Sequence, residues 1–253
     1  DDSLETREPF ALNGLEAWSL RQDLLSHRLQ NKQIVDSLKM VKASGILPQG
    51  SVGEHVFHGQ VEQVEEFADK LLADYPDTFI DPVAFNLTIG EFKLMGQLDG
   101  ISAEGIFNYR MAKTKGNQIL NTWIRHLMLN CLQLDGVVCE SRLITENDDY
   151  SFLAVPDAKA ILHSLLELYW QGLQQPVPFF AETSFAFAKA HFKNNKTASA
   201  IKTAWEGGFN SSGEGNDLYH QQLYATAPLD EPFKELALAV YEPVKAHIIG
   251  GKL

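Results

Sequence analysis

Three side chains in the segment 96–110 have the types and spacing of a metal-dependent phosphodiester-cleaving site that has lost essential charges. Asp99 closes an alternating apolar strand, and a second strand after a short turn carries Asn108 and Arg110. A catalytic Mg²⁺ requires hard anionic oxygens, so a working site would need a second carboxylate on the second strand, and a lysine there could orient the nucleophilic water. Here a neutral amide and an arginine stand at those two positions.

The remaining charges predict that this segment is not catalytic. One carboxylate and one amide would hold Mg²⁺ weakly, although the ion must also lower the pKa of its water and clamp the scissile phosphate. Lysine is a compact donor to the nucleophilic water, whereas arginine is a planar fork suited to carboxylate or phosphate. We therefore expect Asp99, Asn108 and Arg110 to form a vestigial site with no catalytic residue, no metal and no cofactor.

Hydrophobic periodicity predicts a helical N-terminal segment over residues 1–75. Apolar residues recur at helical spacing in three stretches, at 15–29, 34–43 and 52–73. Gly45 follows the second stretch, where glycine can take the left-handed conformation that ends a helix.

Residues 80–155 are expected to form the sheet core. Between 81 and 110 the period changes to two, which predicts a hairpin and a further strand. A helix over 117–132, a strand over 136–144 and a strand over 150–155 follow. This order of helices, hairpin, strand, helix and strand predicts a mixed sheet flanked by helices.

Residues 156–253 are expected to be mainly helical. Helices are predicted over 158–172, 183–192, 197–205 and 232–247, with a glycine-rich loop before the last. Pro156 and Pro232 stand at helix starts, where the missing N–H costs little. We expect this tail to pack as a helical layer on the sheet.

The formal net charge of −12 argues against autonomous binding to nucleic acid, because lysine and arginine contacts to phosphate supply most non-specific affinity. It favours a subunit whose partners carry the positive charge. Arg110, Lys113 and Lys115 form a local basic cluster that is a candidate DNA-binding site. A solvated loop is the alternative interpretation.

Two cysteines, Cys131 and Cys139, have neither CxxC spacing nor a disulfide framework, which fits a reducing cytoplasm. His126 is the neighbouring histidine that could activate one of them, but the sequence favours inert thiols. No apolar run approaches the roughly 20 residues that cross a bilayer, and no signal peptide opens the chain. The chain begins at Asp1 without a methionine, so we expect a fragment of a longer protein.

Two weaker motifs favour structural roles. His55 and His58 stand beside Glu54 at a spacing seen among metal ligands, but both lie off the apolar stripe of their predicted helix, so solvent-facing histidines are expected. The loop 211–217 is rich in glycine and serine but carries two acidic residues that would repel phosphate, so it is expected to be structural.

The layout around Asp99 resembles that of the PD-(D/E)xK nucleases. Active members carry a Gly-x-x-Asp-Arg block, of which this chain keeps Gly96 and Asp99 but has Gly100 in place of the arginine. Their Asp-Tyr-Lys block corresponds to residues 108–110, Asn-Tyr-Arg. The resemblance therefore implies the fold without the activity.

A third nuclease feature, a helix with Gln-x-x-x-Tyr, is also incomplete. Gln118 is followed by Thr122 and then Trp123.

Three blocks, DDSLETREPFALNGLEAWSLRQDLL, GILPQGSVGE and WEGGFNSSGEGNDLYHQQLY, resemble the C-terminal domain of RecC, the gamma subunit of bacterial exodeoxyribonuclease V. The resemblance covers essentially the whole chain. It implies an α/β fold with a PD-(D/E)xK nuclease-like mixed β-sheet flanked by helices, an extra C-terminal helical layer, and one domain over residues 1–253.

The same resemblance implies a function within the RecBCD helicase-nuclease. RecB and RecD would be partner subunits, and the domain would dock RecD and help guide DNA strands during double-strand break repair by recombination, in the cytoplasm and away from membranes. The alternative is an active Mg²⁺ nuclease that uses Asp99 with Glu91 or Glu104. A third interpretation is an interaction module unrelated to DNA.

Overall fold

The computed structural model describes residues 11–30, 34–208 and 211–253. The chain divides into two compact units, residues 1–75 and 76–253. Residues 1–10, which open the first of the three resembling blocks, lie outside the described residues. The expectation of one domain over residues 1–253 stays a prediction.

The first unit is helical, as its periodicity predicts. A reciprocal cap opens its first helix: the Asn13 side chain accepts from the Glu16 N–H at 2.9 Å, and the Glu16 carboxylate accepts from the Asn13 N–H at 3.0 Å. Gly45 has a φ of 73°, which confirms the left-handed stop. The elements are α1 (Gly14–Leu29), the 3₁₀ helix η1 (Ile34–Ser37), α2 (Leu38–Ala43) and α3 (Gly50–Leu72).

The apolar stripe of α3 is buried, and the two histidines of α3 face solvent, so both predictions for this helix are confirmed. Phe57 and Val64 are fully buried on that stripe, whereas His55 and His58 are exposed. Neither histidine belongs to a group of potential metal ligands among the described residues.

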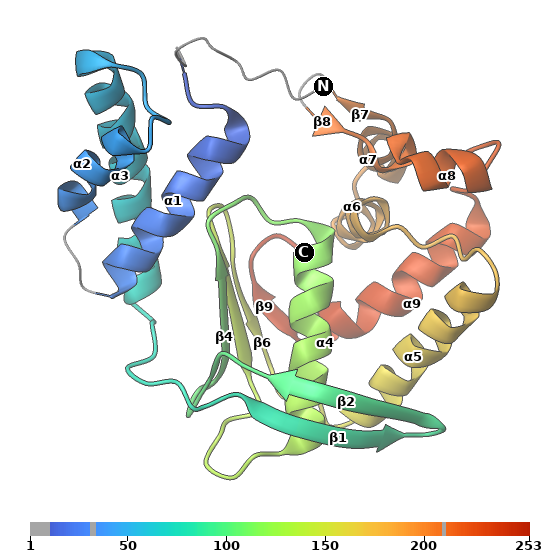
Figure 1. Ribbon diagram of the computed structural model, residues 1–253. Coiled ribbons are helices and arrows are strands. Elements are labelled where there is room, and N and C mark those ends of the chain that lie inside the picture. The colour runs from blue at the N-terminus through green and yellow to red at the C-terminus, as the bar shows by residue number, and fades with distance from the viewer. Residues whose placement is uncertain (1–10, 31–33, 209–210) are drawn as a thin grey trace. The chain divides into compact units, whose positions relative to one another are not determined.

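The second unit contains a mixed sheet beside a separate hairpin (Figure 1). The strand order of the main sheet is β3-β4-β5-β6-β9, in which β4 and β5 are parallel and the other pairs are antiparallel. This confirms a mixed α/β fold. The strands are β1 (Val83–Ile89), β2 (Phe92–Leu98), β3 (Ile101–Ser102), β4 (Gly105–Arg110), β5 (Ser141–Thr145), β6 (Asp149–Phe152) and β9 (Ile248–Gly250), with β1 and β2 forming the hairpin.

Helix α4 (Gly116–Leu132) connects the parallel strands β4 and β5, since parallel neighbours need a crossover that brings the chain back to the same end. Its apolar stripe is buried as predicted, with Ile119, Trp123 and Leu127 inaccessible to solvent. The strand expected over 136–144 begins only at Ser141. Gln133 and Gly136 both have positive φ, at 46° and 74°, which interrupts an extended chain.

The C-terminal helices are found where the sequence predicts them, but several short elements are not anticipated. The predicted helices are α5 (Ala158–Gln174), α6 (Ala181–Phe192), α7 (Thr197–Glu206) and α9 (Glu231–His247). The additional elements are β7 (Gly207–Gly208), β8 (Ser211–Ser212), the 3₁₀ helix η2 (Glu214–Asn216), α8 (Leu218–Leu223) and β9. Elements of two to six residues are too short to carry a readable period.

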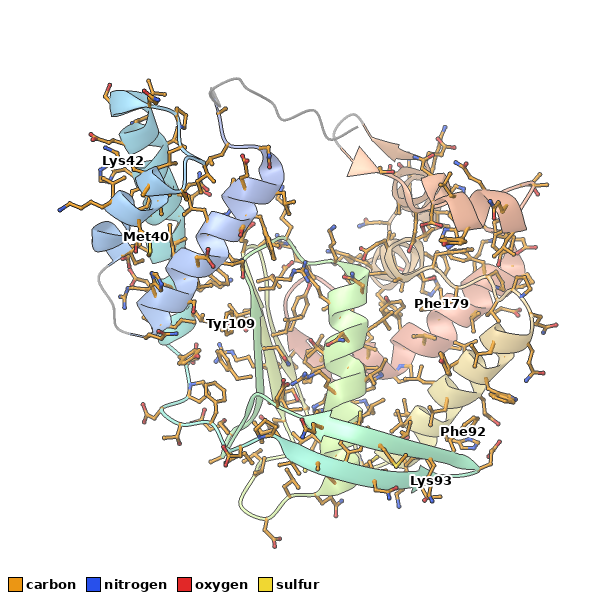
Figure 2. All side chains as sticks on the ribbon, viewed as in Figure 1. Met40, Lys42, Phe92, Lys93, Tyr109 and Phe179 are labelled. Carbon is orange, nitrogen blue, oxygen red and sulfur yellow. The ribbon has the colours of Figure 1, made fainter. Side chains whose placement is uncertain are left out.

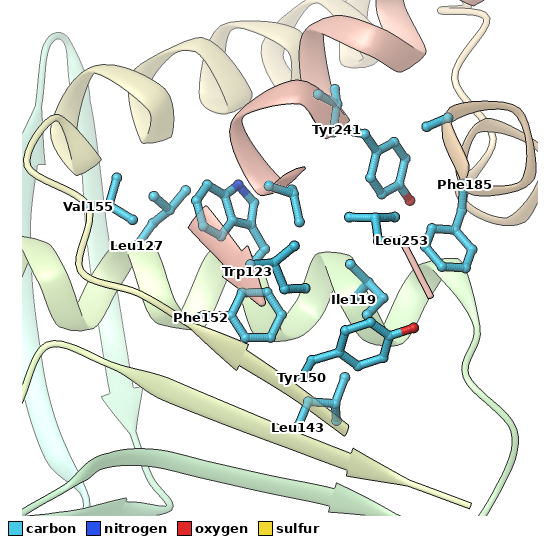
Figure 3. Close-up of a cluster of buried hydrophobic side chains, with 14 of the residues drawn as sticks. Ile119, Trp123, Leu127, Leu143, Tyr150, Phe152, Val155, Phe185, Tyr241 and Leu253 are labelled. Carbon is cyan, nitrogen blue, oxygen red and sulfur yellow. The ribbon is translucent and has the colours of Figure 1, made fainter. Parts of the chain in front are cut away.

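Strand β9 corrects the expectation of a mainly helical tail that only covers the sheet. Tyr150, Ser151 and Phe152 of β6 pair with residues 248–250, so the tail also supplies an edge strand. The main core lies between the sheet and the helices α4, α5, α6 and α9, with Trp123, Tyr150 and Tyr241 among its fully buried side chains (Figure 3). None of the helices in the described parts of the chain is long and apolar enough to cross a membrane.

Candidate functional site

The segment that the sequence singles out lies where β4 passes into α4. A pocket of about 340 Å³ lies between them, and we call it the amide pocket. Tyr109, on its β4 side, is labelled in Figure 2. The described lining residues are Asn108, Tyr109, Arg110, Asn117, Gln118, Asn121, Thr122 and Leu143, none of which is acidic.

Two buried amides of this pocket have N–H groups without an acceptor among the described residues, Nδ2 of Asn108 and Nε2 of Gln118. Gln118 is only 7% exposed. Its orientation is fixed, because its Oε1 accepts from the Lys115 N–H at 3.1 Å at the start of α4. An unsatisfied buried donor costs about 1–3 kcal/mol. The described lining is therefore polar but offers no carboxylate to a metal ion.

Asp99 is held by an arginine and does not line the amide pocket. Nη2 of Arg125 donates to the Asp99 carboxylate at 2.5 Å and to the Asp99 carbonyl at 2.6 Å. Arg125 lies seven residues after Gln118, on the same face of α4. The Phe107 N–H donates to the Gly100 carbonyl at 2.9 Å, so the chain next to Asp99 runs beside the part of β4 that precedes Asn108. The carboxylate of Asp99 is therefore already matched by a cation.

Neither alternative carboxylate reaches Asp99. Glu91 lies in the β1–β2 turn, beyond the seven residues of β2, which extend about 23 Å at ~3.3 Å per residue. Glu104 lies in the turn between β3 and β4, at the opposite end of that hairpin from Asp99. A second carboxylate for a metal at Asp99 does not come from either residue.

Glu91 belongs instead to a cluster with His163 and Glu167 of α5, whose ligand atoms lie within 4.8 Å of one another. His163 places Nε2 3.2 Å from Glu91 and Nδ1 3.5 Å from Glu167. Its ring also packs edge-on against Phe92, which is labelled in Figure 2, with centroids 5.9 Å apart. Because the two ring nitrogens face different carboxylates, the arrangement suits a polar link between the hairpin and α5 rather than one shared ion.

A second cavity, between α6 and α7, is lined by lysines in a chain that is otherwise acidic. We call it the lysine pocket, defined by Lys115, Lys189, Lys193 and Lys196, and its volume is about 1000 Å³. Glu182 also lines it. However, the Glu182 oxygens already accept from the backbone N–H groups of Gly116 at 2.8 Å and Asn117 at 3.1 Å.

The lysines of this pocket are crowded. Partial desolvation, followed by the charges of Lys189, Lys245 and Lys252, lowers the pKa of Lys193, while Asp148 opposes that effect. The sequence prediction did not include the lysines of α6 and the following loop. A signal was present, since residues 183–205 contain four lysines and no acidic residue.

The three DNA-binding candidates from the sequence differ in the pockets that they line, and their role in binding DNA stays a prediction. Arg110 lines the amide pocket, Lys115 lines the lysine pocket, and Lys113 lines neither. All three are exposed.

The loop that starts at Ser211 caps a helix. The Glu214 carboxylate accepts from the backbone N–H groups of Glu182 at 3.1 Å and Thr183 at 2.8 Å, at the start of α6. A negative charge at the N-terminus of a helix stabilises the helix. Its role is structural, as the sequence predicts.

The family of the chain follows from sequence comparison. Residues 1–192 match the model of the RecC C-terminal domain. The chain belongs to the RecC C-terminal domain family.

Two relatives are about one quarter identical to this RecC-family chain over the stretches that align. It is 26% identical over 240 residues to the RecBCD enzyme subunit RecC of Escherichia coli (strain K12), covering 88% of this chain and 21% of that protein. It is 25% identical over 230 residues to the same subunit from Buchnera aphidicola subsp. Schizaphis graminum, covering 85% and 21%. The chain thus spans about a fifth of the length of these curated relatives.

The cysteines of this RecC-family chain are not arranged for catalysis. His126 is bonded through Nδ1 to the Ser141 hydroxyl at 2.9 Å and through Nε2 to the Leu153 carbonyl at 2.9 Å, which leaves neither nitrogen for a thiol. Burial raises the pKa of Cys131, and only the thiolate is a good nucleophile. The expectation of inert thiols therefore agrees with the geometry around His126 and Cys131.

Proposed function

We propose that this chain is a non-catalytic scaffold domain of a RecC subunit, with a PD-(D/E)xK nuclease-like fold that has lost its activity. In this proposal the domain works in the cytoplasm within a RecBCD helicase-nuclease, beside RecB and docked to RecD. It helps to guide DNA strands during double-strand break repair by recombination. Family membership and the printed name of the relatives, RecBCD enzyme subunit RecC, support this role.

The ion pair between Arg125 and Asp99 is the main observation in support of a domain without catalytic activity. A metal would have to displace a guanidinium that also holds the Asp99 carbonyl. The neighbouring strand offers Asn108 in place of a carboxylate, and Glu91 and Glu104 lie elsewhere. These contacts argue against the alternative of an active Mg²⁺ nuclease.

The chain is expected not to cut linear single- or double-stranded DNA with Mg²⁺ or Mn²⁺, because Asp99 belongs to no group of potential metal ligands among the described residues. Cleavage should be measured on end-labelled DNA, next to a working nuclease at equal concentration. Asp99→Asn is the matched variant, since the substitution would not change cleavage by a contaminating nuclease. If the original chain cuts DNA and Asp99→Asn does not, the site at Asp99 is active.

An exposed apolar patch on α5 supports the docking half of the proposal. Tyr169, Trp170 and Leu173 are 65%, 55% and 60% exposed and share one side of the helix. Aromatic side chains of this kind carry much of the binding energy of protein interfaces. We assign this patch to RecD.

Deleting from a full-length RecC the segment that corresponds to this whole chain is expected to abolish co-purification of RecD, while the association with RecB persists. Retained RecD would rule out the docking role and leave a role in guiding DNA.

Truncating the α5 patch tests which surface is used. Tyr169→Ala with Trp170→Ala is expected to weaken RecD binding roughly 30-fold or more, since a hot-spot side chain contributes about 2 kcal/mol or more. Met95→Ala is the control, because Met95 is a 72% exposed apolar residue on β2. Equal binding by both variants would show that RecD uses another surface.

The lysine pocket supports the DNA-guiding half. It gathers four cations, and its acidic lining residue, Glu182, is bound to backbone N–H groups. Its other lining residues are mostly small, so a phosphate backbone could approach closely. Lysine contacts to phosphate supply affinity without reading the base sequence.

A further inference from the structure

Lys193, at the end of α6, lies among other lysines from separate parts of the fold. Its Nζ donates to the Lys252 carbonyl, and the Nζ of Lys245, on α9, donates to the main-chain oxygen of the next residue, Leu253, at 2.9 Å. Lys189 precedes Lys193 by four residues, so the two side chains start from the same side of the helix. Lysines of α6 and α9 therefore gather around the segment that ends at residue 253.

The Lys193 amine is accessible and is not neutralised by a carboxylate. Lys42, Lys202 and Lys234 each pair with a glutamate, whereas Lys193 is exposed and forms no ion pair with a carboxylate of the described residues. Its partner is instead a carbonyl, which accepts a hydrogen. A neutral amine in that contact keeps its lone pair free, because it still acts as the donor.

The surroundings of Lys193 favour the neutral amine. Partial desolvation, followed by the charge of Lys189, lowers the pKa of Lys193, and Lys245 and Lys252 add to the effect while Asp148 opposes it. A lysine that is desolvated or next to other cations is a better nucleophile, since more of it is unprotonated.

The same lysines favour an anionic reagent. Lys189, Lys193 and Lys196 line the lysine pocket, and the Nζ of Lys189 lies 5.5 Å from the ring centre of Phe185, which also lines it. Clustered cations raise the local concentration of anions. An acyl phosphate carries its anionic phosphate next to the reactive carbonyl, so attraction of the phosphate brings that carbonyl to the amines.

We propose that Lys193 is a modification site, acylated by small acyl phosphates that the neighbouring lysines attract. The neutral Nζ attacks the carbonyl carbon and forms an amide bond. The bond from that carbon to the phosphate oxygen breaks, phosphate leaves with the electron pair, and the surplus proton of the nitrogen passes to solvent. The product is uncharged, so the lysine pocket loses one cation. Only the consequence, weaker DNA binding, rests on the proposed function.

Acetyl phosphate is the first probe, applied at neutral pH to full-length RecC assembled with its partners, and peptide mass spectrometry measures the rate at each lysine. Lys193 is expected to react roughly fivefold or more faster than Lys93, an exposed lysine of β2 (Figure 2), since two exposed charge pairs account for a factor of this size. N-Hydroxysuccinimidyl acetate, which has no phosphate, is the second probe and should prefer Lys193 less. Equal rates at the two lysines with acetyl phosphate, or equal preferences with both reagents, would overturn the inference.

Lys189→Gln with Lys196→Gln removes two neighbouring charges and keeps the reacting amine. This variant is expected to slow the reaction of Lys193 with acetyl phosphate roughly fivefold, whereas Lys189→Arg with Lys196→Arg keeps the charges and should keep most of the rate. Lys39→Gln with Lys70→Gln is the matched control, at exposed positions of α2 and α3. If the control slows the reaction as much as the first variant, the inference is wrong. Neither DNA binding nor RecD binding is measured, so this failure leaves the scaffold role unaffected.

Discussion

Lowering the pH from 7 to 4 is expected to destabilise the fold by about 3 kcal/mol through His126 alone. Burial, the largest cause, lowers the pKa of this imidazole from 6.5 to about 4, and His247 adds to the effect while the Leu153 carbonyl opposes it. The ring is fully buried and stacks on Trp123, with centroids 5.6 Å apart. Because Nε2 donates to the Leu153 carbonyl, Nδ1 must accept from Ser141, which only the neutral form can do.

The direction of this dependence follows from proton binding. Between pH 6.5 and about 4 the unfolded chain holds a proton on His126 that the folded chain does not. The contribution of neutral His126 to the free energy of unfolding is therefore fully present above pH 6.5 and is lost as the pH falls toward 4.

Urea unfolding from pH 7 to 4 measures this effect. His126→Gln keeps a polar side chain but cannot titrate, so it should be less stable at pH 7 and show a shallower pH slope. The control is His55→Gln, at an exposed position. Parallel slopes for the original chain and His126→Gln would contradict the prediction.

The triple variant Lys189→Gln, Lys193→Gln and Lys196→Gln, made in full-length RecC assembled with its partners, is expected to weaken DNA binding roughly 30-fold at about 0.2 M salt. The expectation follows from the release of counterions from single-stranded DNA, where each phosphate contact adds about 0.7 to the salt slope. Removing three contacts should therefore lower the slope of log affinity against log salt by about 2.

A filter-binding or anisotropy titration over a range of salt concentrations measures both quantities. The matched control is Lys39→Gln, Lys70→Gln and Lys93→Gln, which removes the same charge outside the lysine pocket. If the two triple variants lose the same affinity, net charge rather than the lysine pocket is responsible.

The sequence by itself determined the elements whose periodicity is long and local. The stripe of α3, the β1–β2 hairpin and helix α4 are found where it predicts them, because their patterns are set by neighbours a few residues apart. It also determined the chemical identities of Asn108 and Arg110, which suffice to question catalysis. Short elements such as α8 and β9 lack such a pattern.

Only the tertiary structure decided which side chains meet. Arg125 contacts Asp99 across 26 residues of sequence, and Lys115 shares a pocket with lysines of α6 and the loop after it. Strand β9 forms because its backbone pairs with β6, nearly a hundred residues earlier. These contacts depend on strand register and on how α4 crosses between β4 and β5, and one residue of slip would turn each side chain to the other face. Local propensity carries no information about strand register or about the path of α4 between β4 and β5.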